Sequence, residues 1–158
     1  MIARVSTEKK CWGSVAHVFH SLEAATSFLN VDAGWQCSRH YHKHRANQFF
    51  VISGRIIVEE WAETLPGKRH VMVLGPGMSC VVQNMNWHRF KVLDSGSMVE
   101  VYWSDRIEFI VRLDDIVRYD VGGKFNLEEY KDVKDGDDFF VDDDQFFPAI
   151  EDDYHGDA

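Results

Sequence analysis

Residues Gly34–Gly54 read GWQCSRHYHKHRANQFFVISG, and this stretch decides how the rest of the chain is interpreted. It holds three of the chain's eight histidines within five positions. Alternate residues of a β-strand point to one face, so His40, His42 and His44 would project together. A second interpretation stays open, in which the stretch is a solvated basic edge. The basic residues that favour it are Arg39, Lys43 and Arg45.

Short segments rich in β-branched and aromatic residues recur on both sides of this stretch. Turn signals such as Ser53-Gly54 and Asp94–Ser97 separate them. Many short strands are typical of an all-β sandwich or barrel, not of alternating strands and helices. We expect one short helix at Ser21–Ala25. The expected strands are Ser14–Phe19, Ser27–Val31, Gln36–His42, Gln48–Ile52, Arg55–Trp61, His70–Leu74, Ser79–Val82, His88–Leu93, Met98–Trp103 and Ile107–Leu113.

The C-terminal residues differ in composition from the rest of the chain. Residues 127–158 hold 13 Asp and Glu against two Lys, whereas the remainder is nearly neutral. Asn126 followed by Glu129 is typical of a helix N-terminus. After Asp135, acidic and aromatic residues alternate in a pattern that fits no packed strand. We therefore expect a barrel domain at 1–125 and a helical, acidic, flexible tail at 126–158, which either docks on a groove or only solubilises the protein.

Composition excludes several classes of protein. Apolar residues make up 45% of the 158 residues, enough for one folded domain. No apolar run reaches the roughly 18 residues that a membrane span needs. The sequence also has no stripe of clustered basic residues, which a nucleic-acid-binding protein would need. Three scattered cysteines and a polar, charged start without a secretory signal favour the cytoplasm.

The spacing within the opening stretch resembles the first cupin motif, in which two histidines and a glutamate bind a metal and a closing glycine makes a turn. Residues 84–88, Asn-Met-Asn-Trp-His, lie where the second cupin motif supplies its last histidine. The resemblance implies a double-stranded β-helix, or jelly-roll barrel, which agrees with the strand pattern. The matching residues are Gly34, His40, His42, Asn47, Gly54 and His88.

Longer stretches resemble the type II mannose-6-phosphate isomerase domain of the cupins. Lys10–Ser14 is similar to its Arg-Pro-Trp-Gly-Ser, His42–Phe49 to its His-His-His-Arg-Ala-Glu-His-Trp, and Asp114–Arg118 to its Asp-Asp-Ile-Val-Arg. The likeness spans residues 9–124. It implies aldose–ketose isomerisation of a sugar phosphate, in which a metal stabilises an enediolate and a base moves the proton between carbons.

Several departures separate this chain from that family, and three of them concern the expected site. Asn47 replaces the ligand glutamate, His40 replaces a glutamine, and Lys124 replaces the arginine of a closing Tyr-Gly-Arg. One carboxylate is lost and one imidazole is gained, which suits a divalent ion: Zn²⁺ first, with Fe²⁺, Ni²⁺ or Mn²⁺ as alternatives. A barrel that lost its metal together with the glutamate is the other interpretation. The expected ligands are His40, His42 and His88, with Asn47 or Gln48 as an oxygen donor.

The remaining site residues are assigned by their chemistry and their place in the resemblance. Glu100 and His44 are the candidate bases for the proton transfer. Trp87 is the candidate for lining the pocket, next to His88. The candidates for binding a phosphate or another anion are Lys10, Arg45, Arg89 and Lys124.

A different function class stays open because Asn47 stands in the place of the ligand carboxylate. A non-catalytic small-molecule-binding cupin or a three-histidine iron dioxygenase fits that change, whereas Arg45-Ala46 and Asp114–Arg118 favour the isomerase. Cupins of this type commonly pair through sheet edges, so we expect a homodimer.

Overall fold

The computed structural model describes residues 1–104, 111 and 114–146, and these form an antiparallel β structure. Their helical content is one turn of 3-10 helix, η1, at Leu127–Tyr130. No helix among the described residues is long and apolar enough to cross a membrane. The strands are β1 (Thr7–Lys10), β2 (Gly13–His20), β3 (Ala24–Val31), β4 (Trp35–Gln36), β5 (His40–Tyr41), β6 (Ala46–Trp61), β7 (Lys68–Leu74), β8 (Ser79–Val82), β9 (Trp87–Trp103), β10 (Val117–Arg118), β11 (Gly123–Lys124) and β12 (Asp138–Asp142).

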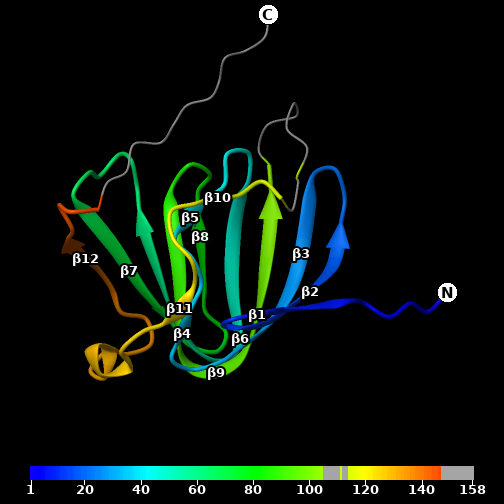
Figure 1. Ribbon diagram of the computed structural model, residues 1–158, viewed down its shortest axis with the longest axis horizontal. Coiled ribbons are helices and arrows are strands. Elements are labelled where there is room, and N and C mark those ends of the chain that lie inside the picture. The colour runs from blue at the N-terminus through cyan, green and yellow to red at the C-terminus, as the bar shows by residue number, and fades with distance from the viewer. Residues whose placement is uncertain (105–110, 112–113, 147–158) are drawn as a thin grey trace, which may run out of the picture.

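Two long strands, β6 and β9, organise the sheet. They pair antiparallel from Ala46 opposite Trp103 to Trp61 opposite Trp87. β3, β2 and β1 continue the sheet beyond β9, and β7 and β12 continue it beyond β6, on the other side of the molecule in Figure 1. β8 also pairs with β6, and the short strands β4 and β5 pair with β9. The expected all-β jelly-roll architecture is confirmed.

The segments Ser53-Gly54 and Asp94–Ser97 are bends inside strands rather than turns between strands. The β6–β9 register shifts between Val51 and Ile56, as at a β-bulge. Gly54 has φ of 79°, and a Cβ there would lie 2.5 Å from the carbonyl oxygen of Asp94. Only glycine fits this close approach of the two backbones. Four expected strands are therefore two long, bent strands.

The predicted helix at Ser21–Ala25 is wrong. The Ser21 hydroxyl accepts hydrogen bonds from the backbone amides of Glu23 and Ala24, which makes a tight turn, and β3 begins at Ala24. Serine side chains compete with helical hydrogen bonds in this way. The strand expected at Ile107–Leu113 lies outside the described residues except for Val111.

The barrel interior is filled by alternate residues of the strands. On β3, for example, every second side chain is buried and the side chains between them are more exposed. The buried ones are Ala25, Ser27, Leu29 and Val31. Phe49 and Val51 of β6 join Leu29 and Val31 in the largest apolar cluster. Burying one such side chain contributes about 1.5–3 kcal/mol. The polar residues on this inward face are thus the ones placed to build a site.

The expectation that the tail fits no packed strand is wrong. β12 pairs with β7, from Asp138 opposite Met72 to Asp142 opposite Lys68. Lys68 forms an ion pair with Asp142, and a His70 ring nitrogen lies 2.5 Å from Asp138. Acidic residues are accepted in this strand because the neighbouring strand supplies basic partners. Whether the chain divides into domains at residue 125 stays a prediction.

The helix expected to start at Asn126 is confirmed, although it is only η1. The Asn126 side chain accepts a hydrogen bond from the Glu128 amide at 3.1 Å. The described part of the tail, residues 126–146, is called the C-terminal segment below. It covers the outer face of β7 and β9, where Tyr130 and Val141 pack against a buried apolar cluster that includes Val71.

Candidate metal centre

Strand pairing brings together three histidines that are far apart in the sequence. His40 begins β5, and His42 follows its last residue, so the two side chains lie on one face. His88 lies in β9 directly opposite His40 in the antiparallel pair. All three are buried, with exposed fractions of 8% or less. The strand expected at Gln36–His42 is split into β4 and β5, but the part that carries the histidines keeps its alternation.

A backbone carbonyl fixes the orientation of each imidazole. Because a carbonyl oxygen only accepts, each Nδ1 carries the hydrogen and each Nε2 keeps its lone pair. Metal-binding histidines are held in the same way by a partner on their second nitrogen. The pairs are His40 with Ser38 at 2.7 Å, His42 with Asp115, and His88 with Asn86 at 2.9 Å.

The free sides of the three imidazoles converge. Their ligand nitrogens all lie within 4.8 Å of one another. Burial lowers the pKa of His40 and His42 well below the ordinary value, and that of His88 to about 4, so the rings are neutral. The buried Nε2 of His42 has no hydrogen-bond partner among the described residues. Three neutral imidazoles that converge in this way, with the Nε2 of His42 unpartnered, fit a divalent transition metal.

Strand alternation separates Asn47 from Gln48. Asn47 is fully buried, and its Nδ2 lies 2.8 Å from a Glu100 oxygen and 3.3 Å from the Nε2 of His88. Gln48 points to the opposite face, where its amide donates to the Ser79 hydroxyl at 3.1 Å. The expectation that Gln48 could be a ligand is therefore wrong, and Asn47 borders the histidine cluster.

Glu100 lies beside the histidine cluster within a hydrogen-bonded chain. The Tyr102 hydroxyl donates to Glu100 at 2.7 Å, and Tyr102 is also hydrogen-bonded to Ser27. The Ser27 hydroxyl lies 2.8 Å from Nδ1 of His17, which lines the pocket. Burial raises the pKa of the Glu100 carboxyl. A carboxyl group tuned in this way is suited to accept and release protons.

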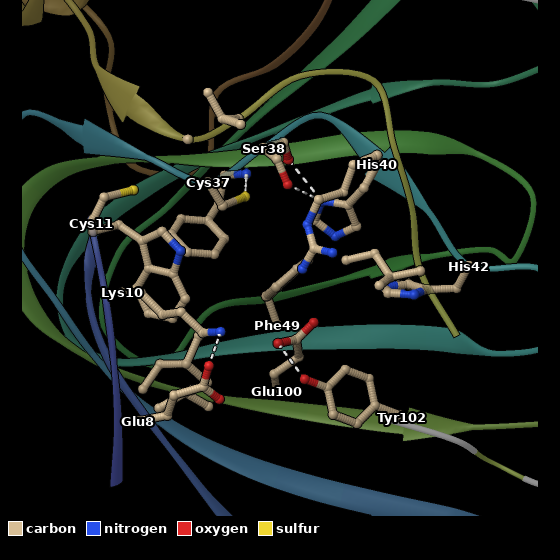
Figure 2. A pocket seen from close by; sticks show the side chains of 18 of the residues that line it. Glu8, Lys10, Cys11, Cys37, Ser38, His40, His42, Phe49, Glu100 and Tyr102 are labelled. Atoms are coloured by element: carbon tan, nitrogen blue, oxygen red, sulfur yellow. Dashed lines mark hydrogen bonds and ion pairs between the residues drawn. The ribbon is translucent and has the colours of Figure 1, made fainter. Parts of the chain in front are cut away.

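A pocket of about 320 Å³ opens onto this cluster. Figure 2 shows His40, His42, Glu100 and Tyr102 on one side of it and Lys10 on the other. Three cationic side chains line the pocket and favour an anionic occupant. They are Lys10, whose Nζ lies 2.5 Å from Glu8, Arg45, whose guanidinium lies 4.1 Å from the Tyr102 ring centre, and Arg118.

His44 and Trp87, both expected at the site, do not line the pocket. The backbone amide of His44 donates to the Asp115 carboxylate at 2.9 Å, in a turn after the strand alternation has ended. Trp87 packs behind the site, with its ring centre 4.7 Å from that of Tyr41. Trp87 precedes His88 in a strand, so the two side chains face opposite ways.

Arg89 and Lys124, expected to bind an anion, also lie away from the pocket lining. Arg89 forms an ion pair with the buried carboxylate of Glu59. The Lys124 amine lies 5.3 Å from the ring centre of Trp35. Arg89 follows His88 in β9, so alternation turns it to the outer face of the sheet. These positions do not support the assigned roles.

Tyr102 and Arg118 line the pocket, and sequence reasoning assigned neither of them to the site. Tyr102 stands two positions after Glu100 in β9, and that spacing alone could have placed both side chains on one face. Arg118 was read only as part of the Asp114–Arg118 likeness. Its place comes from pairing with His40 across β5 and β10, a contact between residues 78 positions apart, which no local pattern reveals.

We expect the variant Asn47→Glu to bind Zn²⁺ about tenfold more tightly, because an anionic oxygen is a better donor than an amide. The same change sets two carboxylates side by side, since Asn47 now donates to Glu100, so the metal-free variant should melt at a lower temperature. Gln48→Glu is the matched control, on the opposite face, and should change neither quantity. Unchanged Zn²⁺ affinity in Asn47→Glu would show that position 47 does not reach the ion.

No family model matches the sequence, and no curated protein matches it. The fold is similar to solved structures at low identity. KdgF from Halomonas sp. is 19% identical with a TM-score of 0.53, and the match covers 65% of this chain and 89% of KdgF. The Cnp3 cupin domain of Schizosaccharomyces pombe is 16% identical with a TM-score of 0.54, over 64% of this chain and 69% of that domain.

The oxalate decarboxylase of Bacillus subtilis is 13% identical with a TM-score of 0.55. That match covers 68% of this chain but 30% of the decarboxylase, so this chain spans about a third of that protein's length. At these identities the likeness shows the fold alone. The chain has the cupin fold.

Proposed function

From the cupin fold and the three-histidine site, we propose that this protein is a metal-dependent isomerase of a small sugar phosphate, similar in reaction to mannose-6-phosphate isomerase. One observation carries the proposal: three neutral imidazoles converge beside a pocket that His40 and His42 line and that also holds the buried carboxyl group of Glu100. That combination provides both metal ligands and a proton carrier.

The metal ligands in this proposal are His40, His42 and His88. A divalent ion bound there supplies a Lewis acid for the substrate's oxygens. The likeness to the Bacillus subtilis oxalate decarboxylase supports such a role, since Mn(II) centres are described in that protein. We propose Zn²⁺ first, with Fe²⁺ or Ni²⁺ as alternatives because neutral imidazoles suit these ions. Mn²⁺ is a further alternative because of the Mn(II) centres described in the decarboxylase.

Glu100 takes the role of the base in this proposal. Its raised pKa, caused by burial, brings the carboxyl group closer to the range in which it exchanges protons efficiently. Tyr102 and Asn47 hold the two carboxylate oxygens in place. The chain through Tyr102 and Ser27 to His17 links this carboxyl group to a residue at the pocket wall.

The cationic residues of the pocket would bind the phosphate. Arg45 is 4% exposed and Lys10 and Arg118 line the same pocket, while Glu8 offsets one of these charges. Arginine is well suited to a phosphate because its planar group donates two parallel hydrogen bonds. Lys10 and Arg45 stay candidate anion-binding residues, and Arg118 takes the place of Arg89 and Lys124.

The test uses protein purified without a histidine tag and loaded with Zn²⁺ or Mn²⁺. We expect interconversion of mannose 6-phosphate and fructose 6-phosphate. Glu100→Gln should lower kcat by about 10²–10⁴-fold without loss of bound metal, because the base is removed and the ligands remain. Glu63→Gln, at an exposed position, is the control and should be unaffected. Metal-loaded protein that leaves both sugar phosphates unchanged would refute the isomerase assignment.

A three-histidine iron dioxygenase is the second candidate. It is favoured by the ligand set, which among the described residues consists of imidazoles without a carboxylate. Oxygen consumption by the Fe²⁺-loaded protein with small enolisable or diketone substrates would separate it from the isomerase. Oxygen-independent turnover would exclude it.

We also propose that two copies pair in the cytoplasm. Phe50, Ile52 and Val81 are 40–45% exposed on β6 and β8, and apolar side chains gathered in this way often mark an interface. The proposal of the cytoplasm rests on the three scattered cysteines of the sequence, which suit a reducing compartment. A monomeric mass by light scattering at micromolar concentration would count against pairing.

A further inference from the structure

The strands that carry the metal ligands have a second, aromatic face. Tyr41 stands between His40 and His42, and Trp87 precedes His88, so alternation turns both rings away from the pocket. The two ring centres are 4.7 Å apart, and both side chains are at least 95% buried. The position of the ligands therefore depends on how this rear face is packed.

Phe146 of the C-terminal segment fills that rear face. It is 5% exposed, and its ring centre lies 6.2 Å from that of Trp87. Trp61 and Tyr119 stand edge-on to it at 4.9 and 4.7 Å. The Arg39 guanidinium lies 4.2 Å from its ring centre, within the range of a cation–π contact.

These neighbours of Phe146 lead directly to the ligands. Arg39 precedes His40, and its carbonyl accepts a hydrogen bond from the Tyr119 amide at 2.8 Å. Trp61 lies opposite Trp87 in the β6–β9 pair. Phe146 thus contacts residues next to both ligand-bearing segments, β5 and the start of β9, from outside the barrel.

Polar contacts hold the C-terminal segment in this position. Asp143 accepts a hydrogen bond from the Trp61 indole at 3.1 Å, and its backbone carbonyl accepts one from the Phe146 amide. Asp142 forms an ion pair with Lys68 at the end of β12. The segment reaches the rear of the site because β12 pairs along β7 and ends opposite Lys68, after which Asp143 contacts Trp61 at the end of β6.

We propose that Phe146 is a positioning residue for the metal centre. It packs behind the three histidines, supports Tyr41 and Trp87, and thereby fixes the positions of the histidine side chains. The inference rests on the proposed metal site. Seating of the C-terminal segment and metal binding are then thermodynamically coupled, and each strengthens the other by the same factor.

The first test is Zn²⁺ affinity, measured by competition with a chromophoric chelator. Phe146→Ala should weaken Zn²⁺ binding about tenfold, the lower end of what the loss of outer support costs a metal site. Phe146→Leu keeps much of the volume and should restore most of the affinity. Phe140→Ala removes a ring from the same segment, 54% exposed and stacked on His70, and should leave the affinity unchanged.

The second test is the reciprocal effect, measured by chymotrypsin cleavage within the C-terminal segment. Saturating Zn²⁺ should slow cleavage of the wild-type protein by about tenfold, and this protection should vanish in Phe146→Ala. The factor by which Zn²⁺ slows cleavage of the wild-type protein should equal the factor by which Phe146→Ala weakens Zn²⁺ binding.

The outcomes separate this inference from the function on which it rests. Wild-type protein that binds Zn²⁺ no better than Phe146→Ala overturns the inference and leaves the metal site intact. Equal weakening in Phe140→Ala and Phe146→Ala also overturns it, because it shows general loosening. Wild-type protein that binds no metal at all overturns both. A selective loss in Phe146→Ala, rescued by Phe146→Leu, establishes it.

Discussion

Replacement of His42 by alanine should abolish stoichiometric Zn²⁺ binding. The Nε2 of His42 is buried, has no hydrogen-bond partner among the described residues and faces the nitrogens of His40 and His88. Its other nitrogen is held by the Asp115 carbonyl, so the ring has no alternative orientation that keeps this contact. Removing one of three ligands should weaken binding by more than about 100-fold, since even outer partners cost 10–100-fold.

His44→Ala is the matched control for this experiment. His44 is two positions away but does not line the pocket, so metal content should stay at the wild-type level. The measurement is elemental analysis of tag-free protein after gel filtration, with thermal melting to confirm that both variants fold. Stoichiometric Zn²⁺ in His42→Ala, or loss of metal in both variants, would contradict the ligand assignment.

Replacement of Glu59 by glutamine should lower the free energy of unfolding by about 3–5 kcal/mol, the cost of breaking a buried ion pair. Glu59 is fully buried in β6, and its carboxylate lies 3.2 Å from Arg69 and 3.1 Å from Lys91 and is also paired with Arg89. Tyr130 of η1 closes the cluster at 3.3 Å. The variant leaves three cations with no carboxylate at their centre.

The effect of Glu59→Gln has a defined pH dependence. Burial acts to raise the pKa of Glu59, but Arg89, Lys91 and Arg69 together hold it below the ordinary value. The ionised Glu59 carboxylate therefore stabilises the fold fully above its pKa in the unfolded chain, about 4.3. This stabilisation is lost as the pH falls through the lower pKa that Glu59 has in the folded protein. Urea unfolding of the wild type and of Glu59→Gln at pH 7 measures the size of the effect, and the same comparison at pH 3 measures its loss at low pH.

Glu128→Gln provides the comparison for the stability measurement. Its carboxylate also forms an ion pair, with Lys131 at 2.7 Å, but both side chains are more than 60% exposed. Exposed pairs contribute about 0–1 kcal/mol, so this variant should unfold almost like the wild type. A Glu59→Gln protein that is as stable as Glu128→Gln would show that the buried cluster does not stabilise the fold.

Local sequence was sufficient for the histidine face and for most strand positions. The alternation of His40 and His42 depends only on the two-residue period of a strand, and the structure retains it although β5 is two residues long. The spacing to Asn47 and Gly54 indicated the barrel through its resemblance to the cupin motif, and strand alternation along the chain separately indicated an all-β fold. His88 was predicted from the resemblance of residues 84–88 to the second cupin motif, and its position opposite His40 in the structure agrees with that prediction.

Local sequence failed where a distant strand decided the outcome. Ser53-Gly54 contains the residues of a turn, but the backbone of β9 pairs with it and converts it into a bulge within a longer strand. The acidic segment Asp138–Asp142 is a poor strand in isolation, and it becomes one because β7 places Lys68 opposite Asp142 and His70 within reach of Asp138.

Strand alternation, turn residues and the resemblance to the cupin motifs were enough to assign the fold class and the three converging histidines. Long-range strand pairing, in contrast, sets which charged residues face the pocket. Arg45 and Arg118 line it, whereas Arg89 pairs with Glu59 on the other side of the sheet. The reason is physical: a charged side chain follows the face to which its strand turns it and the partner that pairing brings within reach, and long-range pairing sets both.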